Sequence, residues 1–377
     1  MNPAAGNLIS ADSHVTEPPD LWVSRIDEPF RDRAPHYAHD ASGGGLLFLI
    51  DGQVPKPVNA NIAVGQRPED YREFFKKGLD AARPGGWDPV ERLKDMDVDG
   101  IESAVLYTSQ GFRLFALDDP PYQEACFRAY NDWLAEYCKE APHRLFGIAM
   151  VSLFDIDHAV AEIRRCREMG LRGAMIWGVP PEELPFDDAR YEPFWSEAEA
   201  LAMPLSLHIA TGGDRPARET ARTETAYWTR LGKLVSLPAE IQCTLTTLIF
   251  SGVLERHPHL RLVSAEYDMG WVPYYLQYAD RLYRRWSPML DLSLPMQPSE
   301  YFLRQVSLTF IREPIGMKMV AGGLLPADNV MWCDDYPHGA STWPDSRGVI
   351  AETMGDLHEA DRRKIVRDNA SRLYGIG

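Results

Sequence analysis

The chain has 377 residues, a formal net charge of −16 at pH 7, 45% hydrophobic residues and 25% charged residues. The apolar fraction is ordinary for a packed globular protein and argues against a disordered chain. The acidic balance argues against a nucleic-acid partner, because phosphate binding needs a basic face and no long Lys/Arg run is present.

The five cysteines form no CxxC pair and no even framework, which favours a reducing compartment over a disulfide scaffold. No apolar stretch reaches the roughly 18 residues that a membrane span needs, and the polar start lacks a basic leader. We therefore predict a cytoplasmic protein that does not associate with a membrane.

Short runs of Val, Ile and Leu recur along the chain, and most are followed by a segment with helical periodicity. Most of these runs are too short and too uniformly apolar for a half-exposed antiparallel sheet, and they suit a parallel sheet buried on both faces. They predict eight strands, at residues 8–12, 101–108, 146–153, 173–177, 204–209, 260–266, 305–311 and 330–335.

The intervening helices are predicted at 120–141, 156–169, 238–256 and 271–286. Asp119 is a candidate N-cap for the first, and Gly170 ends the second. One strand per unit predicts a parallel α/β fold. Eight such units, without a Gly-rich dinucleotide loop after the first strand, favour a single (β/α)8 TIM barrel that spans the whole chain.

Two stretches do not fit the basic barrel. Residues 16–88 are rich in Pro and Gly and include GGGLLFLIDGQ, which has the pattern of a small hairpin, while residues 211–237 are polar. Both begin at the carboxyl end of a strand, the face where barrel enzymes place their active sites. We interpret them as insertions that form lids or subunit contacts, which makes a homo-oligomer the expected assembly and a hetero-oligomer possible.

Acidic and imidazole side chains gather at the predicted strand ends. Asp12 and His14 lie two apart, so they share one side of the first strand, and Glu17 follows in the next loop. Further candidates close the fifth, sixth and eighth strands: His208, Glu266, Asp335 with its neighbour Asp334, and His338.

Each of these residues alone has a structural explanation, such as a buried core histidine or a helix cap. Their coincidence at one rim instead indicates a metal site, because buried charges need a partner and a divalent cation satisfies several at once. Nitrogen and oxygen ligands without cysteine suit Zn, Mn or Fe(II). A carboxylated lysine bridging two metals is not expected, since Trp177 occupies the end of strand four.

Several motifs together resemble the amidohydrolase-related family typified by aminocarboxymuconate semialdehyde decarboxylase. They are DSHVTEP near the N-terminus, SLHI, SGVLERHPHLRLVSAE followed by GWVP, and DDYPHGASTWPDS. The resemblance extends from Asp12 to the closing NASRLYG and implies a TIM barrel with a divalent metal. It further implies decarboxylation or hydrolysis of small carboxylated substrates, often derived from aromatic compounds.

The resemblance also implies roles for single residues. Asp12 and His14 match the family's first-strand ligand pair, His208 matches the fifth-strand ligand, and Asp335 matches the Asp of the DYP motif, which is both ligand and proton acceptor. At the end of strand six the family's decarboxylases carry a catalytic His, whereas this chain has Glu266. That replacement turns a proton donor into a base or an additional ligand.

Three functions remain open at this point. The first is a mononuclear hydrolase or decarboxylase of a small carboxylated or carbonyl-containing substrate, in which Asp335, Glu266 and His338 handle protons. The second is a dinuclear Fe or Mn/Fe oxygenase, because seven donor side chains exceed the three or four protein ligands that one metal needs. The third is a metal-bearing partner subunit without activity of its own.

The substrate itself is not evident from the sequence. Arg113 and Arg312 are candidate partners for a substrate carboxylate, which an arginine can hold through two parallel hydrogen bonds. An aromatic wall of the substrate pocket has five candidates, although aromatic residues at such junctions more often belong to the core: Phe112, Phe115, Trp177, Trp228 and Trp271.

Overall fold

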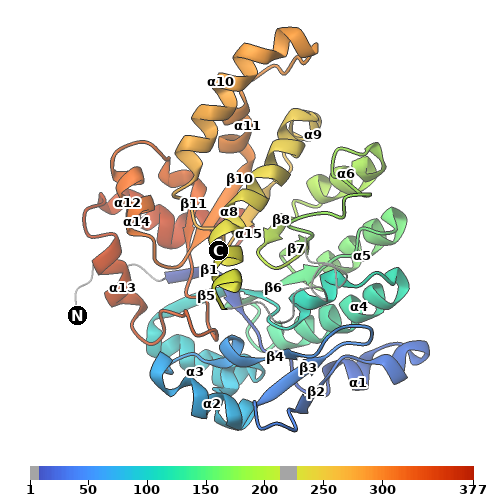
Figure 1. Ribbon diagram of the computed structural model, residues 1–377. Coiled ribbons are helices and arrows are strands. Elements are labelled where there is room, and N and C mark those ends of the chain that lie inside the picture. The colour runs from blue at the N-terminus through green and yellow to red at the C-terminus, as the bar shows by residue number, and fades with distance from the viewer. Residues whose placement is uncertain (1–7, 213–226) are drawn as a thin grey trace.

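The computed structural model describes residues 8–212 and 227–377. At its centre lies a sheet of eight parallel strands in the order β1-β5-β6-β7-β8-β9-β10-β11. Figure 1 shows these strands grouped at the core with helices outside them. The strand bounds are Leu8–His14 (β1), Ile101–Tyr107 (β5), Leu145–Met150 (β6), Gly173–Ile176 (β7), Leu205–His208 (β8), Leu262–Ala265 (β9), Val306–Phe310 (β10) and Val330–Trp332 (β11).

The two edge strands of this sheet, β1 and β11, come together and complete the barrel. The Asp335 amide donates to the Asp12 carbonyl at 3.2 Å, and the Asp334 amide donates to Ser10 Oγ at 3.0 Å. All eight strands predicted from the sequence are present, with ends that differ by a few residues, and the predicted (β/α)8 barrel is confirmed.

Helices cover the barrel from outside. They are α3 (Pro89–Asp99), α4 (Pro120–Cys138), α5 (Ile156–Glu168), α6 (Glu192–Ala200), α8 (Tyr227–Phe250), α9 (Val253–Arg256), α10 (Val272–Leu290), α11 (Pro298–Gln305), α12 (Pro314–Ala321), α13 (Ser346–Thr353), α14 (Glu359–Arg363) and α15 (Asn369–Tyr374), with a π-helical turn at Lys364–Asp368. In the part of the chain that the structure describes, no helix is long and apolar enough to cross a membrane.

Local signals in the sequence explain several helix boundaries. The Asp119 side chain accepts the Tyr122 amide and starts α4, and Asp155 does the same for α5. Gly170, with φ of +96°, follows α5 in the left-handed conformation that glycine adopts easily. The start of α8 differs from the prediction at residue 238, because Pro238 lies inside the helix rather than in its first turn.

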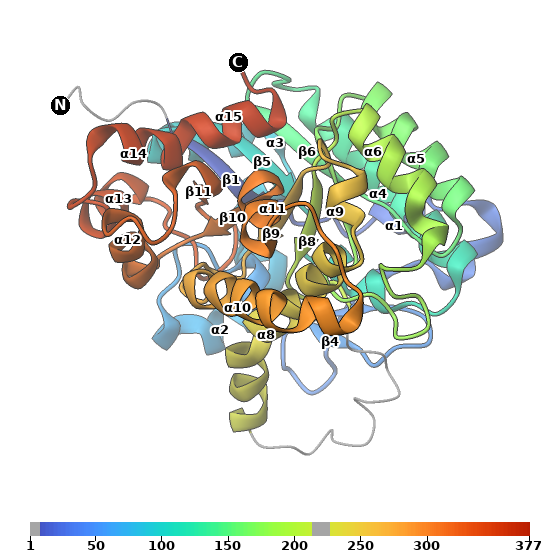
Figure 2. The same ribbon diagram turned by 90° about the horizontal axis from the view of Figure 1, so that it is seen from above.

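The insertion after β1 forms a small layer of its own. It contains α1 (Leu21–Arg25), the antiparallel strands β2 (His36–His39), β3 (Leu46–Leu49) and β4 (Lys56–Pro57), and α2 (Tyr71–Lys77). Phe48 points inward, where its ring packs against Trp22 with centroids 5.2 Å apart. In Figure 2, α15 lies at one end of the molecule, and α2 and β4 lie toward the other.

Of the second predicted insertion, at 211–237, residues 213–226 lie outside the described part of the chain, and 227–237 form the first turns of α8. Short 3₁₀ segments complete the connections, at Glu28–Arg33, Asn59–Ile62, Pro68–Asp70, Gly78–Ala81, Pro84–Gly86, Gly111–Ala116, Ala189–Tyr191 and Ala327–Asn329.

Candidate metal centre

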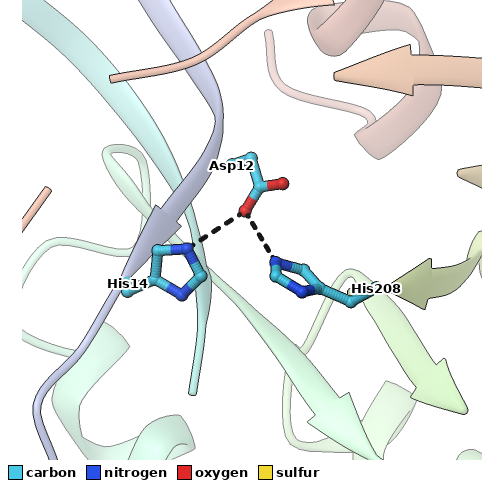
Figure 3. Close-up of side chains that lie close together, drawn as sticks. All are labelled: Asp12, His14 and His208. Atoms are coloured by element: carbon cyan, nitrogen blue, oxygen red, sulfur yellow. Dashed lines mark ion pairs between the residues drawn. The ribbon is translucent and has the colours of Figure 1, made fainter. Parts of the chain in front are cut away.

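Side chains from two strands meet at the carboxyl end of the barrel. Asp12 and His14 come from β1, and His208 is the last residue of β8. Asp12 Oδ1 lies 3.5 Å from the Nε2 atoms of both His14 and His208, and Figure 3 shows the carboxylate between the two rings. Each of the three side chains is at most 1% exposed.

The orientation of both imidazoles is fixed by the backbone. His14 Nδ1 lies 2.8 Å from the Thr108 carbonyl, and His208 Nδ1 lies 2.9 Å from the Ile209 carbonyl. Because a carbonyl only accepts, each Nδ1 carries the proton and each Nε2 directs a lone pair at the cluster. Neither Nε2 has a hydrogen-bond partner among the described residues, and the same is true of Asp12 Oδ1.

Such an arrangement fits a cation. Buried polar atoms without a hydrogen bond are costly, and three of them here lie close enough to coordinate one ion. Two imidazole nitrogens with carboxylate oxygens suit Zn, Mn or Fe(II). The residues present therefore fit the divalent metal predicted from the sequence.

Asp335 adds a fourth donor, from the loop after β11. Its Oδ1 lies 3.3 Å from His14 Nε2 and 2.8 Å from His338 Nδ1. Burial raises the pKa of Asp335, but the adjacent His338 and His14 rings outweigh burial and hold it well below its usual range. Its carboxylate is therefore ionised and available as a ligand.

His338 forms a second group with Asp335 and His14. Its ring stacks on His14 with centroids 4.0 Å apart, and its Nε2 lies 2.8 Å from Ser109 Oγ. The side chain is 13% exposed, so it lies at the margin of the buried cluster. That position allows it to contact both a metal ligand and a bound substrate.

Glu266 completes the cluster from the end of β9. Its Oε2 lies 3.5 Å from His208 Nε2, and its side chain is 20% exposed. A left-handed φ of +63° turns the backbone here, and the Glu266 amide donates to Thr309 Oγ1, whose hydroxyl in turn donates to Asp12 Oδ2 at 2.9 Å. Burial, followed by repulsion from Asp335 and Asp12, raises the pKa of Glu266 well above its ordinary value.

Of the predicted ligands, Glu266 and Glu17 belong to neither donor group. Glu266 still lies 3.5 Å from His208 Nε2, whereas Glu17 is held by the loop after β5. The Glu17 carboxylate accepts the Thr108 hydroxyl and three backbone amides of the loop after β5, at 3.1 Å from Ser109, 3.0 Å from Gln110 and 3.2 Å from Gly111. Glu17 thus holds the loop that carries Ser109, the residue that contacts His338. Its role as a direct ligand stays a prediction.

Asp334, the neighbour of Asp335, faces away from the cluster. Its Oδ1 accepts the hydroxyls of Ser10 and Ser13, each at 2.7 Å, and the Tyr336 amide at 3.3 Å. Of the two adjacent aspartates left open by the sequence, Asp335 is therefore the one in position to bind a metal.

The predicted substrate contacts lie outside the cluster. Arg113 donates to the Pro57 carbonyl at 2.7 Å, and Arg312 is exposed after β10. Trp177 is buried against Phe154, with its indole N–H 3.3 Å from the Phe115 carbonyl. These three assignments stay predictions.

Two further residues lie near the cluster. Phe112 is one of the candidate pocket walls predicted from the sequence, whereas the sequence predicts no role for Ser109. The Phe112 ring stacks on His208 with centroids 4.4 Å apart, so an apolar wall covers one side of the cluster. Ser109 is linked to His338 by a short side-chain contact. The signal for both is their position directly after β5, at the functional end of the barrel.

Residues 11–376 match the family model described as amidohydrolase. A γ-resorcylate decarboxylase from Rhizobium sp. (strain MTP-10005) is 28% identical over 343 residues, which cover 85% of this chain and 95% of that protein. A γ-resorcylate decarboxylase from Rhodococcus jostii (strain RHA1) is 30% identical over 76% of this chain and 87% of that protein. A 2-amino-3-carboxymuconate-6-semialdehyde decarboxylase from Dictyostelium discoideum is 24% identical, with 77% of each covered.

Solved structures show the same fold. An amidohydrolase from Mycobacterium avium subsp. paratuberculosis K-10 aligns with a TM-score of 0.77 at 22% identity, covering 100% of this chain and 99% of that chain. A dihydroxybenzoic acid decarboxylase from Polaromonas sp. JS666, solved with manganese and the inhibitor 2-nitroresorcinol, aligns with a TM-score of 0.69 at 20% identity, covering 99% and 98%. With the family model matched almost from end to end, the chain belongs to the amidohydrolase family, as its motifs predict.

Proposed function

We propose that the protein is a metal-dependent decarboxylase that acts on a small aromatic compound bearing a carboxylate. The observation that carries the proposal is the buried cluster of Asp12, His14 and His208, whose inward atoms have no hydrogen-bond partner among the described residues. The names of the relatives support the reaction, because the curated relatives reported above are decarboxylases.

Asp12, His14, His208 and Asp335 would hold the metal. A divalent cation in this place supplies Lewis acidity, which binds the oxygen atoms of a carboxylated substrate and stabilises developing negative charge. The Thr309 hydroxyl orients Asp12 through its second oxygen, and the carbonyls of Thr108 and Ile209 orient the two rings. These contacts keep the ligands in place before the metal binds.

The remaining groups of the cluster would move a proton. In the decarboxylation of an aromatic acid, a proton adds to the ring carbon that bears the carboxylate. The bond to the carboxylate carbon then breaks, CO2 leaves, and the electron pair of that bond restores the aromatic ring. Glu266 and His338 are the candidates to deliver this proton, because both lie beside the ligands and are partly exposed.

The Phe112 ring would exclude water from one side of the reacting centre. It lies over His208 and is 7% exposed, so it presents an apolar face next to the metal ligands. An aromatic substrate can pack against such a face while its carboxylate is held by polar groups.

The test uses purified protein loaded with Mn or Zn and a panel of hydroxylated benzoates that includes 2,6-dihydroxybenzoate. We expect CO2 release, one equivalent of the decarboxylated phenol, and one deuterium in the product when the reaction is run in D2O. A carboxylate-free panel of amides and esters is the control. Hydrolysis of that panel without any CO2 release would replace the decarboxylase with a hydrolase.

A second candidate is a dinuclear oxygenase, and a specific observation favours it. Two overlapping donor groups share His14, and Glu266 adds a carboxylate beside His208. The extra donors would suit two metals. About two Fe or Mn per chain together with O2 uptake would establish this function, whereas about one metal and no O2 uptake would exclude it. A chain that turns over nothing in either assay would fit a partner subunit.

The predicted homo-oligomer and cytoplasmic location are part of the same proposal. Light scattering of the purified protein would give the assembly, and a mass equal to one chain would contradict the oligomer.

A further inference from the structure

A large cavity lies at the end of the barrel opposite the metal centre. Its volume is about 510 Å³, within the range of small-molecule sites, and its lining includes the residues that directly precede β8, β9, β10 and β11. Residues of α15 close another side, at the end of the molecule that carries this helix in Figure 2. The chemistry proposed above is confined to the carboxyl ends of the strands, so this cavity is a separate site.

Three arginines line the cavity, and all of them donate to neutral acceptors. Arg261 donates to the carbonyls of Pro258 and Leu260, both at 3.2 Å. Arg304 donates to the Leu254 carbonyl at 2.7 Å and to Gln305 Oε1 at 2.9 Å, and it also contacts Met296 Sδ. Arg372 donates to Asn369 Oδ1 at 2.9 Å and to the Asp328 carbonyl at 3.2 Å.

Within residues 8–212 and 227–377, none of these three guanidinium groups forms an ion pair with a carboxylate. The contrast with the rest of the surface is clear, since other arginines of this acidic chain do form such pairs. Examples are Arg25 with Glu136, Arg33 with Asp51, Arg164 with Glu197, Arg165 with Glu162, and Arg256 with Glu192.

Two carboxylates also line the cavity, and each has a partner of its own. Glu199 accepts the His259 amide at 2.6 Å and lies 3.6 Å from His257 Nδ1. Asp328 lies 2.9 Å from Lys364 Nζ. The cavity therefore carries more positive than negative charge, although the whole chain has a net charge of −16.

The electrostatics of Arg261 agree with this excess. Burial lowers the pKa of Arg261 below its usual value and the positive charge of Arg304 lowers it further, while the Glu199 carboxylate offsets only part of this. Two guanidinium groups thus lie near enough to repel one another. An anion placed between them would relieve that repulsion.

We propose that this cavity binds a small oxyanion with at least two negative charges, carried by a phosphate group or by a dicarboxylate. Arginine suits both, because its planar guanidinium forms two parallel hydrogen bonds to either group. The residues that line the cavity directly precede strands that carry His208, Glu266 and Asp335 at or just beyond their far ends, so an occupant would lie at the opposite ends of the elements that hold the metal centre.

The test measures binding of inorganic phosphate and of succinate to the metal-loaded protein by calorimetry, at an ionic strength held constant with NaCl. We expect saturable binding of at least one of them near one equivalent per chain. Arg261→Gln and Arg304→Gln should each weaken it by about tenfold or more, because each removes a charged hydrogen-bond donor. Arg284→Gln is the matched control, since it removes an exposed arginine of α10 whose one side-chain hydrogen bond within the described residues is to Gln297.

Two further variants locate the binding. Arg261→Lys keeps the charge but not the paired donors, so it should bind more weakly than wild type and guards against a folding failure of the glutamine variant. His208→Ala should bind as wild type does, which separates this cavity from the metal centre whatever the enzyme's reaction is. Phosphate binding alone would indicate a phosphorylated ligand, and succinate binding alone a carboxylate. Absence of saturable binding for both, or equal affinity in the arginine variants and wild type, would overturn the proposal.

Discussion

The acidic residues at the mouth of the barrel fall into two groups that the sequence does not distinguish. Glu17 and Asp334 are surrounded by hydroxyl and amide donors. Asp12 and Asp335 instead direct an oxygen at imidazole nitrogens 3.3–3.5 Å away. Asp334 and Asp335 are neighbours in the chain, and they still belong to different groups.

The difference shows how one strand end supplies both ligands and scaffold. A buried carboxylate needs either several hydrogen-bond donors or a counter-charge. Asp334 has donors from Ser10, Ser13 and the following backbone, whereas Asp335 turns away through a φ of +52°. Glu17 and Asp334 use their donors to hold the loops. Asp12 and Asp335 each direct an oxygen at imidazole nitrogens, an arrangement that suits a cation. The predictions that follow separate the two groups.

The largest effect is expected at His208. His208→Ala removes an imidazole ligand whose Nε2 faces the cluster, so the metal content should fall close to zero and turnover should be lost while the fold survives. Metal analysis measures the metal content, a CO2-release assay measures turnover, and circular dichroism checks the fold. His158→Ala is the control, because among the described residues that exposed ring pairs with Glu124 alone. This variant should leave metal content and turnover unchanged. Native metal content in His208→Ala would refute the site.

Next come the adjacent aspartates. Asp335→Asn should lower turnover by about 10²–10⁴-fold even when metal is supplied in excess, since it would remove both a candidate ligand and the proton acceptor that the family resemblance implies. Asp334→Asn should retain metal and cost about 1–3 kcal/mol of unfolding free energy, because an amide disturbs three hydrogen bonds. Steady-state rates measure the loss of turnover in Asp335→Asn, and denaturant titration measures the loss of unfolding free energy in Asp334→Asn. A reversed pattern would show that the roles are exchanged.

Glu266 tests where the chain departs from the pattern of its family. If it binds a second metal, Glu266→Gln should reduce the metal per chain by about half. If it handles a proton beside one metal, the metal should remain and turnover should fall by about 10²–10⁴-fold. We expect one of these two outcomes, because its carboxylate lies 3.5 Å from His208.

A third role for Glu266, as a cap for α10, would cost about 1 kcal/mol of stability and little activity. The structure gives the amides before that helix to Glu313, which accepts from Met269 at 2.8 Å and from Gly270 at 2.6 Å. Unchanged metal content and unchanged rate in Glu266→Gln would therefore contradict both site roles.

Glu17 is expected to behave like Asp334. Glu17→Gln should lower the free energy of unfolding by about 1–3 kcal/mol, because the amide cannot accept from Thr108 and three backbone amides as the carboxylate does. The metal content should stay at the wild-type value. Loss of metal in this variant would instead make Glu17 the direct ligand that the sequence predicts.

The barrel could be predicted because buried parallel strands are short apolar runs that a one-dimensional pattern displays. The predicted barrel in turn predicts most of the cluster, since parallel strands bring their carboxyl ends to one rim. Asp12, His208 and Glu266 meet there. Contacts that depend on loop geometry could not be predicted. Nothing in the sequence near Glu17 shows that the amides after β5 converge on its carboxylate.

Side-chain direction was the other missing quantity. Trp177 and Phe112 are both candidates for a pocket wall by residue type. Trp177 packs against Phe154, whereas Phe112 lies over His208, and the sequence does not show this difference. The arginine cavity was missed for a different reason. Its residues precede strands, whereas barrel topology marks the carboxyl ends of strands as the functional end.

The smallest effect concerns a buried carboxylate far from the metal. Asp99 accepts the Ser346 amide at 2.8 Å and its hydroxyl at 2.5 Å, but burial outweighs these bonds and raises its pKa from 3.8 to about 6. Since the folded pKa is raised, its contribution to stability is fully present below about pH 3.8 and is lost as the pH rises through 6. Asp99→Asn cannot titrate, so the unfolding free energy of wild type minus that of the variant should fall by about 1–3 kcal/mol between pH 4 and 7. A difference that does not change with pH would mean that the two hydrogen bonds from Ser346 suffice to keep this carboxylate ionised, and it would contradict the raised pKa.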